Sequence, residues 1–151
     1  MSNKIEIKGN FVRKPLGKLP EKIPVPVGWF VIGFNLMKDK NDRREYHGKW
    51  FTIKSDHKKI YRVLRFAPNI KGTSSNNNDK EILLDWVGWL DLNNRDEDID
   101  EPIKLTITKT GRIKSIFAGL YHPEPSFRLS TVLALISVIL GILSVVLALV
   151  L

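Results

Sequence analysis

The amino-acid sequence predicts a mainly β fold, a small antiparallel sandwich or barrel, followed by a single C-terminal transmembrane helix. The first observation behind this prediction is that residues 130–151 contain no charged residue and no proline. At about 1.5 Å per residue, such a run is long enough to cross the ~30 Å hydrocarbon core of a bilayer. The second is that short segments rich in β-branched and aromatic residues recur through the rest of the chain. Segments of this kind, separated by polar turns, are typical of small β proteins.

The candidate strands follow in chain order. Residues 4–8 alternate charged side chains with isoleucine, the period of a half-buried strand. Residues 27–37 are too few to span a membrane and favour a central strand buried on both faces. Residues 49–54 and 59–66 flank a polar turn and predict a β-hairpin. Further strands are expected at residues 81–92, 102–108 and 112–117, with connections at 15–26, 38–48 and 72–78.

Three segments divide the chain. Residues 1–120 are expected to form a soluble, basic, β-rich domain, residues 121–127 a connector, and residues 128–151 the transmembrane helix. Pro123 and Pro125 lie in the connector, and proline restricts the backbone to extended conformations. The domain should therefore sit close to the bilayer.

Aromatic and basic residues around the start of the apolar run predict contact with the membrane interface. Tyr121 and Phe127 have ring side chains that favour the headgroup region, and the long side chain of Arg128 can reach the headgroups. We expect these three residues to mark the level at which the chain enters the bilayer.

The charge distribution predicts which side of the membrane the domain occupies. The net charge of +8 is carried entirely by residues that precede Ser130. Arg112, Lys114 and Arg128 lie shortly before the apolar run, and positive residues near a span favour the cytoplasmic side. Residues 1–10 lack the apolar stretch of a signal peptide. We therefore expect a tail-anchored, single-pass membrane protein whose domain lies on the cytoplasmic side, or on the stromal or matrix side in an organelle.

Small residues recur in the apolar run at alternating spacings of four and three. This spacing places them on one stripe of a helix, where they permit close approach of a second helix. We expect the stripe to be a helix-packing seam, either in a hetero-complex or in a homo-oligomer, with a passive tether as the alternative. The seam consists of Ser130, Ala134, Ser137, Gly141, Ser144 and Ala148.

A basic segment with aromatic neighbours is the candidate surface for an anion or a protein partner. It comprises Lys58, Lys59, Tyr61, Arg62 and Arg65. Aromatic rings beside cationic side chains suit bases, nucleotides and anionic headgroups alike. The alternative is that the aromatic residues are core and the basic residues are their solvated neighbours. There is no strong nucleic-acid signal.

No motif in the chain predicts catalysis, a cofactor or a metal site. The absence of cysteine excludes disulfides, iron–sulfur clusters and cysteine-ligated zinc. His47, His57 and His122 lack the spacing of a helical metal site and are expected to be exposed. The acidic segment 96–101 lacks the glycine and glutamate positions of an EF-hand loop. We therefore expect a protein that is not an enzyme.

Two functions remain. The favoured one is a membrane-anchored, non-enzymatic accessory or assembly subunit, whose helix packs through the seam and whose cytoplasmic β domain binds partners. The alternative is a ligand-responsive, homo-oligomeric membrane effector that senses an anionic nucleotide or nucleic acid. The expected partners are the lipid bilayer and other transmembrane helices, with an anionic ligand as a further candidate.

Overall fold

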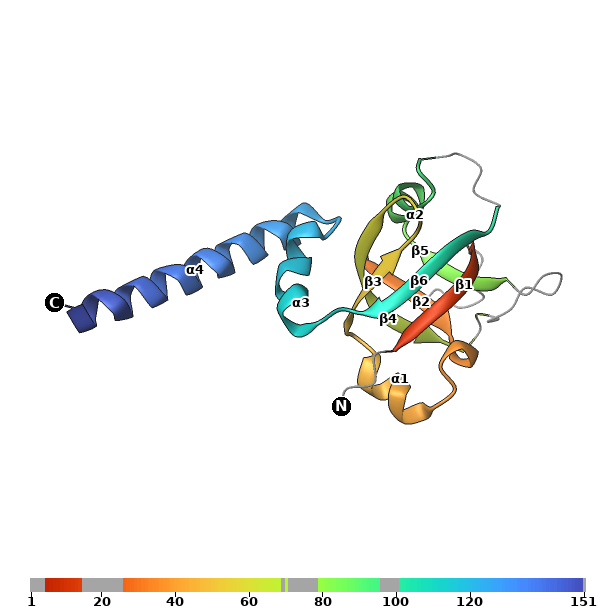
Figure 1. Ribbon diagram of the computed structural model, residues 1–151, viewed down its shortest axis with the longest axis horizontal. Helices are drawn as coiled ribbons and strands as arrows, with labels where there is room; N and C mark the ends of the chain where they lie inside the picture. The colour runs from red at the N-terminus through yellow and green to blue at the C-terminus, as the bar shows by residue number, and fades with distance from the viewer. Residues whose placement is uncertain (1–4, 15–25, 69, 71–78, 96–100, 151) are drawn as a thin grey trace.

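The computed structural model describes residues 5–14, 26–68, 70, 79–95 and 101–150 of the chain. These residues form a closed β-barrel followed by a long C-terminal helix (Figure 1). The strands are β1 (Glu6–Arg13), β2 (Trp29–Gly33), β3 (Trp50–Lys54), β4 (Lys59–Ala67), β5 (Lys80–Leu84) and β6 (Ile103–Lys109). The helices are η2 (Phe34–Leu36), α1 (Lys40–Tyr46), α2 (Trp86–Leu92), α3 (Arg112–Ala118), η3 (Gly119–Tyr121) and α4 (Pro125–Val150).

The strands pair around the barrel in the order β1-β5-β2-β4-β3-β6, and β6 closes it against β1. Most neighbours are antiparallel, but β1 pairs with β5 and β2 with β4 in parallel. The predicted fold class, a mainly β barrel followed by one apolar helix, is confirmed. The parallel pairs were not expected from the sequence.

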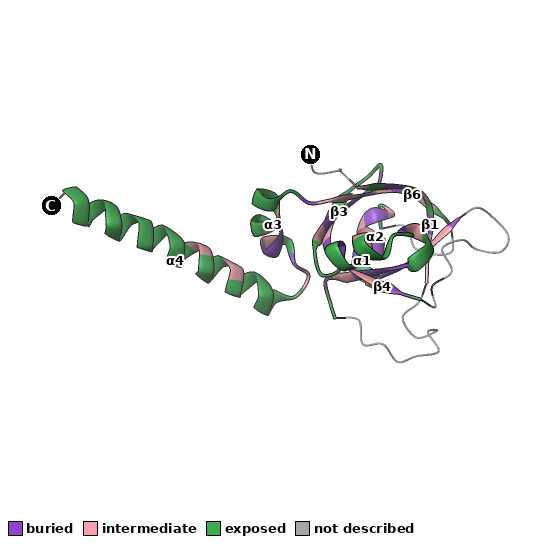
Figure 2. Cartoon of the chain, turned by 90° about the horizontal axis from the view of Figure 1, so that it is seen from below, coloured by how far each residue is buried: buried purple, intermediate pink, exposed green. Residues whose placement is uncertain are grey.

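The core fills the interior of the barrel with aromatic and branched side chains. Phe30 and Phe51 meet edge to face across it, with ring centroids 6.0 Å apart. The two short helices α1 and α2 lie over opposite ends of the barrel (Figures 1 and 2). Tyr46 of α1 packs its ring edge against Phe51, and Trp89 of α2 is fully buried. Both ends of the barrel are thereby shielded from solvent by apolar side chains.

The predicted hairpin is confirmed as β3 and β4, and the strand expected at 102–108 is confirmed as β6. Three expectations were wrong because short helices form where one turn and two strands, or the ends of strands, were predicted. The turn expected at 38–48 contains α1, which begins after Asp39, whose side chain accepts a hydrogen bond from the Asn41 N–H. The strand expected at 81–92 ends at Leu84, because Asp85 caps α2 in the same way through the Gly88 N–H.

The last strand expected from the sequence, at residues 112–117, is also a helix, α3. It is followed by the turn η3, and the chain then enters α4 at Pro125, where proline fits the first helical position. The connections expected at 15–26 and 72–78, and the acidic segment 96–101, lie outside the described residues except for Pro26 and Glu101.

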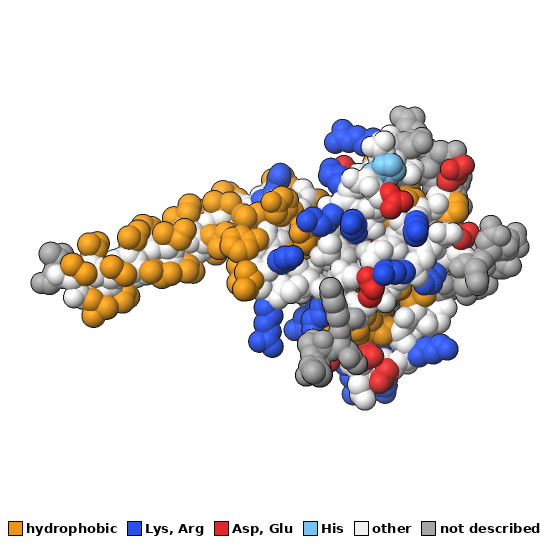
Figure 3. Space-filling model, in the orientation of Figure 1, with side chains coloured by type: hydrophobic (Ala, Val, Ile, Leu, Met, Phe, Trp, Pro, Cys, Tyr) orange, Lys and Arg blue, Asp and Glu red, His pale blue; other side chains and the backbone are white. Residues whose placement is uncertain are grey.

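The helix α4 projects away from the barrel, and hydrophobic side chains cover its surface (Figure 3). None of its described residues is buried. It is long and apolar enough to cross a membrane. Its contacts with the rest of the protein are concentrated in its first turns, against η3 and the barrel.

Candidate functional site

The junction between the barrel and α4 is built around His122. Its ring stacks on Phe127 of α4 at a centroid distance of 4.3 Å and meets Trp50 of β3 edge to face at 6.1 Å. Phe127 also lies 6.3 Å from Trp50. We call His122, Phe127 and Trp50 the junction cluster. These ring contacts pack the first turn of α4 against strand β3 of the barrel. They fix where the helix leaves the barrel.

The His122 side chain is held in one orientation. Its Nδ1 accepts a hydrogen bond from the Glu124 N–H at 3.2 Å, which leaves the proton of the neutral ring on Nε2. On the opposite side the ring lies against Gly28, where an added Cβ would come within 2.0 Å of Nε2. Gly28 also has φ +88°, a conformation that glycine adopts without strain. Both the backbone conformation and the contact with His122 therefore favour glycine at this position.

The expectation that His122 is exposed was wrong, because only 5% of the residue is accessible to solvent. Burial lowers the pKa of His122, and the positive charge of Arg62 lowers it further. The neutral form is therefore favoured in the folded protein. His47 and His57 are exposed, as expected.

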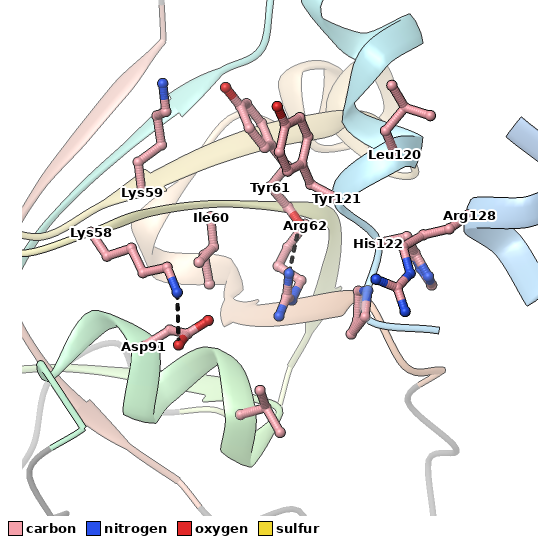
Figure 4. A pocket seen from close by; sticks show the side chains of 12 residues that line it. Lys58, Lys59, Ile60, Tyr61, Arg62, Asp91, Leu120, Tyr121, His122 and Arg128 are labelled. Atoms are coloured by element: carbon pink, nitrogen blue, oxygen red, sulfur yellow. Dashed lines mark hydrogen bonds and ion pairs between the residues drawn. The ribbon is translucent and has the colours of Figure 1, made fainter. Parts of the chain in front are cut away.

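A cavity of about 410 Å³ opens beside the junction cluster (Figure 4). Residues of β4, α2, η3 and α4 line it together, so it is shared between the barrel and the helical segment. It brings together four of the five residues of the predicted basic segment; Arg65 is not among those that line it. The lining residues are Lys58, Lys59, Ile60, Tyr61, Arg62, Val87, Asp91, Leu120, Tyr121, His122, Pro123 and Arg128.

Two of the cations in this cavity already have acidic partners. Arg62 is almost fully buried and makes a bidentate pair with Asp85, at 2.7 Å from Nε to Oδ1 and 3.1 Å from Nη2 to Oδ2. Burial acts to raise the pKa of Asp85, but the bonds and charge of Arg62 and the Gly88 N–H outweigh it, so this pKa lies below its ordinary value. Lys58 pairs with Asp91 at 2.9 Å.

The other two cations are open to a ligand. Lys59 lies 5.8 Å from the centre of the Tyr61 ring, and Arg128 makes no ion pair with any described residue. Tyr121 packs its ring 5.8 Å from that of Tyr61. Lys59 and Arg128 lie at opposite ends of the cavity, with the rings of Tyr61 and Tyr121 between them (Figure 4). An anion could therefore meet either cation without breaking an existing pair.

The predicted interface residues surround the start of α4. Tyr121 and Phe127 are exposed in spite of their packing contacts, and Arg128 is exposed on the first turns of the helix. Of the two tryptophans of α2, Trp86 is partly exposed and stacks under Arg13, whereas Trp89 is buried.

The six residues of the seam all lie on exposed positions of α4. The hydroxyls of Ser130, Ser137 and Ser144 each donate to the backbone carbonyl four residues earlier. Their polar hydrogens are therefore satisfied within the helix. At its N-terminal end the seam borders an apolar groove of about 360 Å³ between α3 and α4. The groove is lined by Ile116, Phe127, Ser130, Thr131, Ala134, Leu135 and Val138.

Among the described residues, no group of three or more His, Asp or Glu side chains is close enough to hold a metal ion. The sequence did not point to Asp85 as the partner of Arg62, nor to the exposed apolar face of α3. The residue type of Asp85 would have been one usable signal, because aspartate is a preferred N-cap at the start of a helix. The chain matches no protein-family model, no curated protein and no solved structure.

Proposed function

We propose that this protein is a membrane-anchored, non-enzymatic accessory or assembly subunit. A β domain with a C-terminal apolar helix fits a membrane-anchored protein. The observation that carries the proposal is that α4 has no buried residue, yet its first turn is packed onto the barrel by the junction cluster. A helix with this composition needs lipid or other helices around it. The barrel is then held at the membrane surface, where it binds soluble partners on the cytoplasmic side.

The seam supports association of α4 with other transmembrane helices. Its residues are small and exposed, so a second helix can approach closely and gain dispersion contacts along the stripe. Because the serine hydroxyls are already bonded within the helix, the association depends on shape more than on new hydrogen bonds. A second helix that packs against the N-terminal end of the seam would also contact the groove beside Ile116.

Native mass spectrometry of the full chain, extracted from its own membranes in mild detergent, tests this function. The wild type should appear in a complex of fixed stoichiometry with other membrane proteins. Gly141→Leu fills the seam and should release the subunit, whereas Val145→Leu adds volume outside the seam and should not. A monomer in all three samples would refute helix packing, and a pure homo-oligomer would favour the alternative function.

The alternative, a ligand-responsive homo-oligomeric effector, is favoured by one observation. The cavity lies at the joint between barrel and helix, so an anion bound to Arg128 of α4 would also face the barrel residues that line the same cavity. Dye-loaded vesicles that contain the full chain provide the test, with ATP or a single-stranded oligonucleotide as probes. Release that depends on a probe, is lost in Arg128→Gln and is kept in Lys104→Gln would support this function. No release with either probe would exclude it for these ligands.

A further inference from the structure

We propose that α3 is an interfacial helix whose exposed apolar face lies in the headgroup region of the membrane that α4 crosses. The barrel would then be held by two lipid contacts, one spanning and one parallel to the surface. This inference rests on the proposed membrane anchoring. It adds a second membrane-binding element that the sequence had predicted to be a β-strand.

The apolar face of α3 is unusually exposed for a helix of a folded domain. Ile113 is 74% exposed, Ile116 57% and Phe117 48%. These residues are spaced i, i+3 and i+4, so they project from one side of the helix. Ala118, by contrast, is buried against the protein. The helix therefore turns large apolar side chains outward and its small one inward, the reverse of what folding alone would favour.

This face continues into the apolar surface of α4. Ile116 shares the groove with Phe127, Ala134 and other residues of the first turns of α4. The two helices lie beside each other where α4 leaves the barrel (Figure 1). If α4 enters the bilayer at this point, α3 is already at the level of the lipid headgroups. Lipid is thus the occupant that the geometry places against this face.

The charges around α3 favour lipid over a second copy of the chain. Arg112 and Lys114 are exposed on α3, Arg128 is exposed at the start of α4, and α3 carries no acidic residue. Apolar residues flanked by cations are typical of helices that lie on anionic membranes. Pairing of the same face between two copies would bring these cations close to one another.

A seven-residue helix binds membranes weakly when it is isolated, but here it is tethered. Anchoring by α4 keeps α3 at a high local concentration next to the surface, so a small intrinsic affinity suffices. With both helices engaged, the barrel would have a restricted tilt and would present a fixed side to partners.

Site-specific fluorescence tests the inference directly, because the chain contains no cysteine. Single variants Ile113→Cys, Lys104→Cys and Leu143→Cys of the full chain are labelled with an environment-sensitive dye. Each is reconstituted in vesicles of phosphatidylcholine and phosphatidylglycerol that carry a lipid-borne quencher at shallow or deep positions. Lys104 is exposed at the start of β6, the end remote from α3, and Leu143 lies within α4.

The Ile113 label should be blue-shifted and quenched best from the shallow position, and the Lys104 label should be neither. A water-exposed Ile113 label, with the Leu143 label quenched from the deep position, would overturn the inference and leave membrane anchoring intact. A shielded Ile113 label that lipid-borne quenchers do not reach would indicate a second copy and would also overturn it. Failure to quench the Leu143 label would refute the anchoring itself.

Discussion

The Arg62 side chain shows how one residue can organise two elements. It lies on the same face of β4 as the buried Ile60 and Leu64, so its charge points toward the end of the barrel that α2 covers. Asp85 neutralises this charge and also caps α2 through the Gly88 N–H. Gly88 has no side chain to displace the guanidinium, since an added Cβ would lie 2.9 Å from Nη2. The ion pair therefore fixes α2 over the barrel.

Removing Asp85 should leave Arg62 buried without a partner. We expect Asp85→Ala to lower the free energy of unfolding by about 3 kcal/mol or more, as for other broken buried pairs. Asp85→Ser keeps a capping hydroxyl and should recover about 1 kcal/mol of this loss. Lys58→Gln removes only the more exposed pair with Asp91 and should cost about 1 kcal/mol or less. Chemical unfolding in mild detergent measures the free energy of unfolding of the wild type and the three variants. Equal losses of this free energy in Asp85→Ala and Lys58→Gln would contradict the expected order.

Gly28 offers a test of the junction that separates steric contact from backbone strain. Gly28→Ala combines a positive φ with a Cβ 2.0 Å from His122 Nε2. Gly48 has φ +75° but nothing within 4 Å of an added Cβ, so Gly48→Ala should cost only the strain, about 1 kcal/mol. Thermal unfolding should show a clearly larger loss for Gly28→Ala. Similar losses in the two variants would mean that His122 moves aside freely.

The lowered pKa of His122 predicts a pH dependence of stability. The unfolded chain binds the proton more readily than the folded chain, so stability is highest above the ordinary pKa of 6.5 and falls as the pH drops below it. Arg62 opposes protonation of the folded ring, and Glu124 favours it. Between pH 7 and about pH 5, His122→Asn should lose less stability than the wild type. The measurement is the free energy of unfolding as a function of pH. His57→Asn, at an exposed position, should show the same pH dependence as the wild type. If His122→Asn shows it too, His122 is not its cause.

At the scale of single elements, the sequence predicted what depends on local periodicity. Alternation in β6 places Leu105 and Ile107 inside the barrel, and the polar turn around Ser55 forms the β3–β4 hairpin. The helices α2 and α3 were missed because their residues are rich in aromatic and β-branched types, which favour strands in isolation. The helix α1 was missed because its residues are mostly charged and polar, and the segment was predicted to be a turn. In α3 the i, i+3, i+4 spacing of Ile113, Ile116 and Phe117 fits a helix, but the strand was predicted from the residue types of the segment instead.

Other features of the elements depend on contacts between residues far apart in the chain. The parallel pairs β1–β5 and β2–β4 join strands separated by other elements, and no local pattern specifies such neighbours. The burial of His122 requires Gly28 and Trp50, which lie far from it in sequence. Four residues of the basic segment do share a cavity, but the acidic partners of two of them come from α2 and its N-cap. Asp91 of α2 pairs with Lys58, and Asp85 at the N-cap pairs with Arg62.

The close approach of η3 and α4 predicts that the helix can be loosened without damage to the barrel. A Cβ at Gly119 would lie 2.5 Å from Thr131 Oγ1, whereas one at Gly111 would meet nothing within 4 Å. Hydrogen exchange in the first turns of α4 should therefore be faster in Gly119→Ala, and that of β6 unchanged. Gly111→Ala is the matched control and should exchange like the wild type. Unchanged exchange in Gly119→Ala would show that α4 does not depend on this contact.

At the scale of the whole molecule, the separation of charge from apolar surface predicts the topology. Every charged residue precedes Ser130, and Arg112, Lys114 and Arg128 lie next to the apolar helix. Positive residues near a span are retained on the cytoplasmic side. Protease should therefore digest the barrel in sealed vesicles whose cytoplasmic face is outward and spare it in vesicles of opposite orientation. Detergent should abolish the difference, and protection in the outward-facing vesicles would reverse the assigned side.

The course of β6 has a mechanical consequence. This strand leads through α3 and η3 into α4, so tension between a membrane and a partner of the barrel would enter the sheet at the end of β6. β6 pairs with β1 on one side and β3 on the other, both antiparallel. The hydrogen bonds of such pairs run across the strands, so a pull along β6 loads many of them in shear at once. The barrel is thus tethered by a strand that resists extraction, rather than by one that could be peeled from an open edge.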